Sequence, residues 1–141
     1  MNAKAEHQII VPYFMVRNAG KFIDFAKAVF SAELISRQTR ENSEDVIHAE
    51  ITIAGNRLFL ANSGQCGGQW ISPSSPEGTC ASTSGGKPIQ MYIYVQSADD
   101  TCRKALAAGG SVVMEPFDDE GGRMCGIADP FENLWWLKST K

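Results

Sequence analysis

The sequence lacks the features that mark membrane, secreted and nucleic-acid-binding proteins. None of its apolar runs approaches the roughly 20 residues that a membrane span needs. The polar segment from Met1 to His7 has no apolar core of the kind that signal peptides carry. A formal net charge of −3 argues against a surface for nucleic acid or anionic lipid. We therefore expect a cytoplasmic protein with neither kind of partner.

Histidine and paired cysteine are also scarce. The chain has two histidines, His7 and His48, and its four cysteines show no CxxC spacing, which argues against a zinc ribbon or a thioredoxin motif. Without a secretory signal, reduced thiols in a cytoplasm are the simplest interpretation. Cys125 falls in a predicted strand and is expected to be a small buried apolar residue.

The composition that is present is that of a folded globular protein. Hydrophobic residues make up 43% and charged residues 21% of 141 residues, enough for one domain with a proper core. We expect a single domain over 1–141, built from a module at about 9–62, a Gly/Ser/Pro-rich connection at about 63–88 and a module at about 89–138. The connection is either a lid or a disordered segment, and the sequence favours neither.

The first module is predicted to run strand, helix, strand, strand, strand. Asn18 can cap the helix, whose apolar residues recur at three- and four-residue spacing: Phe22, Phe25, Ala26, Val29 and Phe30. Alternation over 46–53 places His48 and Glu50 opposite the apolar residues of that strand. The other strands are expected over 9–16, 34–39 and 57–61, with a Gly55-Asn56 turn before the last.

The second module repeats this order. A strand over 89–96 leads to a helix over 98–108, with Ser97 and Asp100 as a capping box and Gly109-Gly110 at its end. Strands follow over 111–115, 123–128 and 134–138. We expect an acidic turn over 118–122 with solvated side chains, a solvated loop arginine at 123, and a tight turn over 129–133.

The two modules match each other at nearly constant spacing. Tyr13, Val16, Ala19 and Ala26 meet Tyr92, Val95, Ala98 and Ala105 at an offset of about 79 residues. Asn56, Leu58 and Leu60 meet Asn133, Trp135 and Leu137 at an offset of about 77. Such self-similarity predicts two copies of one unit. Pairing them would place the helices outside and leave a concave face for a ligand.

Residues 11–16, 47–51, 93–95 and 129–131 together resemble the PhnB-like branch of the vicinal-oxygen-chelate (glyoxalase/bleomycin-resistance/dioxygenase) superfamily. The resemblance covers nearly the whole chain outside the connection. It implies an α+β fold in which two tandem βαβββ modules form a curved, mostly antiparallel sheet cup with helices outside. It also implies a homodimer in many members and a small-molecule ligand in the cup.

The chain departs from the metal-binding members of that superfamily. Their ligands, usually His, Glu or Gln, fall here at Val11, Phe59, Gln90 and Trp136, and only the glutamine can bind a metal. A divalent site of this kind needs three or more protein ligands. We therefore expect no metal cofactor, unless His48 and Glu50 rebuild the site from the neighbouring strand. A second departure is Glu132-Asn133-Leu134, where this branch more often carries Gly-His-Arg.

The candidate ligand-binding residues share the strand parity of the ligand-facing positions or lie beside them: Tyr13, His48, Glu50, Phe59, Gln90, Tyr92 and Trp136. The sequence assigns none of them a catalytic role. The preferred hypothesis is metal-free binding of a small, partly apolar molecule. The alternatives are a metal-dependent lyase, thiol transferase or dioxygenase with a relocated site, and a structural dimer whose aromatic side chains fill the cup.

Overall fold

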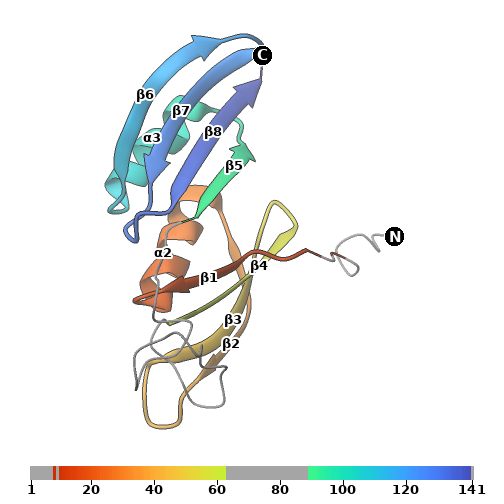
Figure 1. Ribbon diagram of the computed structural model, residues 1–141, viewed down its shortest axis with the longest axis vertical. Coiled ribbons are helices and arrows are strands. Elements are labelled where there is room, and N and C mark those ends of the chain that lie inside the picture. Colours follow the sequence, from red (N-terminus) through yellow and green to blue (C-terminus); the bar gives the residue numbers. More distant parts are fainter. Residues whose placement is uncertain (1–7, 9, 63–88, 141) are drawn as a thin grey trace, which may run out of the picture. The chain divides into compact units, whose positions relative to one another are not determined.

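The computed structural model describes residue 8, residues 10–62 and residues 89–140. The elements follow the order β1, α2, β2, β3, β4 and then β5, α3, β6, β7, β8 (Figure 1). Each half therefore runs strand, helix, strand, strand, strand, which confirms the predicted order. The predicted connection over 63–88 lies outside the described residues. No helix in the described ranges is long and apolar enough to cross a membrane.

The first half forms one four-stranded sheet with the strand order β1-β4-β3-β2. β1 pairs with β4 in parallel, and the other two pairings are antiparallel. The elements are β1 Tyr13–Val16, α2 Ala19–Phe30, β2 Glu33–Thr39, β3 Val46–Ile53 and β4 Asn56–Asn62. The third strand has the predicted bounds, and its apolar and polar residues alternate from Ile47 to Ile53.

The start of the first strand and the position of a turn differ from the sequence-based expectation. β1 begins at Tyr13 rather than near residue 9, since Pro12 has no amide hydrogen for the ladder and contributes only its carbonyl, which accepts from Phe59 N at 2.9 Å. The turn before β4 lies at Ala54-Gly55, one residue earlier than predicted, with φ values of 52° and 83°. Two positive φ values are what a two-residue hairpin turn requires.

The second half forms a separate sheet with the corresponding order β5-β8-β7-β6. Its elements are β5 Gln90–Tyr94, α3 Ala98–Ala107, β6 Ser111–Asp119, β7 Gly122–Ala128 and β8 Leu134–Thr140. β6 runs four residues beyond its predicted end at 115 and shortens the acidic turn to Glu120-Gly121. Pro116 is tolerated because β6 is an edge strand whose register shifts between Met114 and Phe117.

The strand registers confirm the internal repeat. Tyr13 pairs with Phe59 in the first sheet, and Tyr92 pairs with Trp136 in the second. β5 also pairs with β8 in parallel while the rest of its sheet is antiparallel. The α+β class and the mostly antiparallel strand pairing are thus as predicted, and the described residues form two four-stranded sheets. The cup that the two halves are expected to share remains a prediction, which we drew from the internal repeat.

Both helices begin where the sequence predicts. Asn18 Oδ1 accepts from Lys21 N at 3.0 Å, and Ser97 Oγ accepts from Asp100 N at 3.1 Å. The apolar stripe of α2 is buried, and its Phe22 ring lies 5.0 Å from the Phe14 ring of β1. The helices therefore cover one face of a sheet and leave the other face to side chains of opposite parity.

α2 takes part in two compact units. Its first residues group with the first half of the chain, whereas residues 24–30 group with the second half. In the second unit the Phe30 ring lies 4.6 Å from the indole of Trp135, a residue of β8 that is 2% exposed. The C-terminal turns of α2 are thus part of the hydrophobic core of the second unit.

The thiols of Cys102 in α3 and Cys125 in β7 are free and buried. Burial raises the pKa of both thiols, that of Cys125 to about 12.

At pH 8 such a pKa leaves only about one Cys125 thiolate in 10⁴, so we expect Cys125 to resist iodoacetamide in the folded protein. Labelling should increase as the pH rises, and site-resolved mass spectrometry would measure it. The same peptides labelled in urea are the control, and rapid native labelling of Cys125 at pH 8 would contradict the prediction.

Candidate functional site

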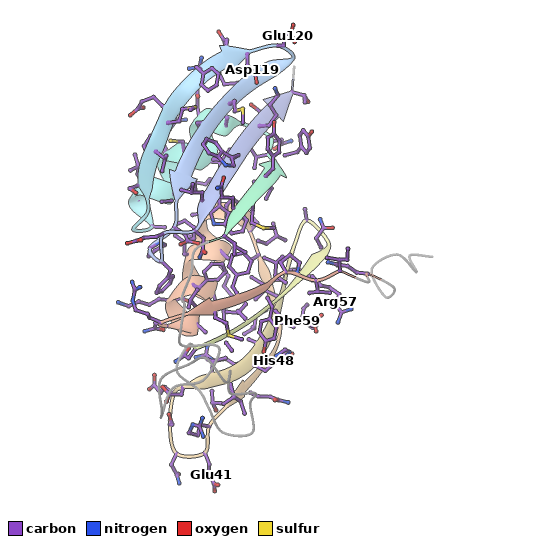
Figure 2. The ribbon with its side chains drawn as sticks, viewed as in Figure 1. Glu41, His48, Arg57, Phe59, Asp119 and Glu120 are labelled. Carbon is purple, nitrogen blue, oxygen red and sulfur yellow. The ribbon has the colours of Figure 1, made fainter. Side chains whose placement is uncertain are left out.

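The helix-free face of the first sheet carries four of the predicted residues. Tyr13 of β1, Phe59 of β4, and His48 and Glu50 of β3 alternate with residues buried toward α2. They share one face because neighbouring strands keep side chains of the same parity on the same side. Figure 2 shows Phe59 and His48 on the side of the sheet that faces away from α2.

Three rings meet on this face. A hydrogen bond of 3.1 Å joins Tyr13 Oη and His48 Nδ1, and the His48 and Phe59 rings lie 4.9 Å apart. The Tyr13 and Phe59 rings meet edge-on at 5.9 Å. Burial raises the pKa of Tyr13, so its phenol keeps its hydrogen at neutral pH. The three rings form an aromatic cluster with one fixed polar contact.

Arg57 belongs to the same face, although the sequence analysis did not select it. Its Nε donates to Glu50 Oε2 at 2.9 Å, and its guanidinium lies 5.3 Å from the centre of the Phe59 ring. Gln8 holds the arginine main chain: Arg57 N donates to Gln8 Oε1 at 2.8 Å, and Gln8 Nε2 donates to Arg57 O at 3.1 Å. Arg57 is two residues before Phe59 in β4, so strand alternation could have found it.

The helix-free face of the second sheet carries the other three predicted residues. Trp136 Nε1 donates to Gln90 Oε1 at 3.0 Å, and Tyr92 lies across from Trp136 in the register. A Cβ at Gly126 would lie 2.6 Å from Trp136 Cζ3, so the indole packs directly on the glycine backbone. Gly126 was not among the predicted residues, because its role depends on the β7–β8 register.

Charged side chains at the hairpin end of this sheet pair with one another. Lys138 Nζ donates to Asp119 Oδ1 at 2.6 Å, and this contact raises the pKa of Lys138. Arg123 contacts Asp99 and Asp118, each at 3.2 Å, and these hydrogen bonds raise the pKa of its guanidinium. Arg123 is therefore an ion-paired strand residue and not the solvated loop arginine that we expected. Asp119 and Glu120 lie at the tip of the β6–β7 hairpin (Figure 2).

The residues at the superfamily's metal positions do not fit a metal. Phe59 has no donor atom, Trp136 Nε1 already donates, and Gln90 Oε1 accepts that hydrogen. In a relocated site His48 and Glu50 would supply two ligands, yet each contacts a neighbour on its own face. Across residues 10–62 and 89–140, no three or more His, Cys, Asp or Glu side chains gather where they could hold an ion.

A comparison with protein families matches residues 8–137 to the Glyoxalase/Bleomycin resistance protein/Dioxygenase superfamily. The chain belongs to this superfamily. Superfamily relatives include uncharacterized proteins from Mycobacterium bovis and Mycobacterium tuberculosis, both 31% identical over 129 residues. The match covers 89% of this chain and 79% and 71% of those relatives, respectively. The resemblance drawn from the sequence is thus confirmed.

Solved structures of other proteins have the same fold. TioX from Micromonospora sp. ML1 superimposes with a TM-score of 0.70 at 20% identity, over 94% of this chain and 98% of TioX. A PhnB protein from Bacillus cereus superimposes with a TM-score of 0.61 at 14% identity, over 94% and 100% of the two chains. These superpositions establish the fold, which a PhnB protein shares. They do not identify a ligand, which has to be inferred from the residues of the site.

Proposed function

We propose that this superfamily member binds a small, partly aromatic molecule on the helix-free sheet faces without the usual metal. The observation that carries the proposal is the pair of rings at the metal positions of β4 and β8. Phe59 and Trp136 occupy them, and each has a tyrosine, Tyr13 or Tyr92, across from it on the neighbouring strand. Aromatic surfaces with a few fixed polar groups are typical of small-molecule sites.

The rings are held in place yet remain accessible. Tyr13 is tied to His48 and Trp136 to Gln90, while Tyr13 is 43% and Tyr92 51% exposed. A fixed ring loses little conformational entropy when a ligand stacks on it, which favours binding. This exposure favours ligand binding over the alternative in which the aromatic side chains only pack on one another.

The proposal is tested by titrating metal-stripped protein with 2-methylnaphthalene and following the ligand's fluorescence. We expect binding without added metal and no change on adding Mn²⁺, Fe²⁺, Zn²⁺ or Ni²⁺. Phe59→Ala should weaken binding about fivefold, because one aromatic contact contributes roughly 1 kcal/mol. Ile35→Ala, at an exposed apolar residue of β2, is the matched control and should leave affinity unchanged. Binding that requires a metal and is lost in His48→Ala would contradict the proposal.

We also propose that the protein is cytoplasmic and that it forms a homodimer. The edge strand β6 exposes apolar side chains that a second copy would cover: Val113, Met114 and Phe117. The superfamily assignment supports a dimer and a small-molecule ligand as its partners.

A further inference from the structure

The Arg57–Glu50 pair leaves several hydrogen-bonding atoms unused beside the aromatic cluster. Within the described part of the chain, Arg57 uses only Nε and Glu50 only Oε2 of their side chains. The Nη atoms of Arg57 and Oε1 of Glu50 have no protein partner there. These atoms reach solvent, since no buried side-chain nitrogen or oxygen among the described residues lacks a partner. The side chains are 27% and 20% exposed, respectively, and so are mostly enclosed.

The pair is fixed next to an aromatic surface. Glu50 lies directly across from Phe59 in the β3–β4 register, and the guanidinium of Arg57 lies over the same ring. Gln8 holds the Arg57 main chain by two hydrogen bonds. Figure 2 shows Arg57, Phe59 and His48 in succession on one side of the sheet. A ring placed against Phe59 or His48 would therefore meet donors and an acceptor at its edge.

We propose that this edge selects an uncharged planar ring that carries a carboxamide-type group. The ligand carbonyl would accept from an Nη of Arg57, and the ligand N–H would donate to Glu50 Oε1. This inference rests on the proposed function and names the ligand class for the first sheet. An amide carries a hydrogen-bond acceptor and a donor side by side. The ion pair offers the complementary groups, with donors at the Nη atoms of Arg57 and an acceptor at Glu50 Oε1.

Charge and desolvation decide against the two nearest alternatives. A ligand carboxylate would gain from Arg57 but would lie beside the Glu50 carboxylate, and like charges this close repel. A purely apolar ring would displace water from both charged groups without replacing its hydrogen bonds. A site built to hydrogen-bond a polar group rejects analogues that lack it more strongly than an apolar pocket rejects a size change.

The test compares ligands that share one ring: 2-naphthamide, 2-naphthoate and 2-methylnaphthalene, each titrated by naphthalene fluorescence. We expect the amide to bind at least about tenfold more tightly than the other two. Glu50→Gln removes the repelling charge and leaves Arg57 uncompensated, so the preference should shift to the naphthoate. Arg57→Met removes the donor to the ligand carbonyl and should reduce the preference for the amide over the methylnaphthalene. Glu41→Gln, at an exposed turn of the same unit (Figure 2), removes the same charge and should leave the ranking unchanged.

Each outcome decides the inference. Equal affinities for the three ligands, tightest binding of the naphthoate to the unmodified protein, or an unchanged ranking in Glu50→Gln would each overturn it. Binding of 2-methylnaphthalene that depends on Phe59 would still support the proposed function in those cases. If none of the three ligands binds, the proposed aromatic ligand and the inference fail together. Circular dichroism of both variants establishes that a lost preference is not a lost fold.

Discussion

Replacing Asp129 by alanine is expected to lower the free energy of unfolding by at least about 4 kcal/mol. The carboxylate is 3% exposed and accepts from Phe131 N at 2.8 Å, Asn133 N at 3.1 Å and Trp135 Nε1 at 3.0 Å. Asn133 Nδ2 also donates to it, at 3.0 Å to Oδ2. Alanine would remove the acceptor of these four hydrogen bonds, and each buried donor that loses its acceptor costs about 1–3 kcal/mol.

The same network joins the last turn to the start of β5. Asn133 Oδ1 accepts from Ile89 N at 3.0 Å, so an amide oriented by Asp129 holds the residue before that strand. Asp129→Asn tests the charge separately from the size. It keeps one acceptor oxygen but turns an NH₂ group toward donors that need an acceptor, so it should also destabilise the protein, by less than alanine does.

Urea denaturation followed by circular dichroism would measure these effects. The matched control is Glu132→Gln in the same turn, because Glu132 is exposed and its substitution should change stability by less than about 0.5 kcal/mol. An Asp129→Ala variant that unfolds within the error of the unmodified protein would show that water replaces the carboxylate.

The sequence predicted the turn over 129–133 but not this buried network. Asp, Pro and Asn favour turns through local backbone geometry, which a sequence displays directly. The buried network also includes the indole N–H of Trp135, a residue that was predicted only as part of a strand over 134–138. Local signals therefore identified the element, while the side-chain partners depend on how β8 packs.

In the candidate site, too, the sequence predicted the local features but not the side-chain partners. The seven candidate side chains were selected from strand parity together with the superfamily's ligand-facing positions, and alternation is a local property of extended chain. Parity alone did not select Arg57, whose value lies in its contacts with Glu50 and Phe59. Gly126 could not be predicted because it has no side chain whose chemistry suggests a role. The strand register shows that the Trp136 ring packs where a Cβ of residue 126 would lie. β6 exceeded its predicted length because Pro116 ends a strand in the interior of a sheet but not at its edge.

Replacing Trp135 by alanine is expected to cost about 3–5 kcal/mol of unfolding free energy. Trp135 matches Leu58 of the first module, yet its indole additionally stacks on Phe30 at 4.6 Å and donates to Asp129. Alanine would leave a cavity where the C-terminal turns of α2 pack. Trp135→Leu restores the residue type of the other module and should recover only part of the loss, because leucine is smaller and has no donor.

Two further variants separate packing from hydrogen bonding at Trp135. Trp135→Phe keeps most of the ring and removes the donor to Asp129, so it should cost about 1.5–3 kcal/mol, the range for a hydrogen bond to a charged group. Trp136→Ala, at the partly exposed neighbour, is the control and should cost less than half of the Trp135→Ala effect. Urea titrations measure all four variants.

Hydrogen exchange should show faster exchange over residues 24–30 of α2 in Trp135→Ala, because these turns belong to the second unit's core. Unchanged exchange there would mean that Phe30 is held without the indole.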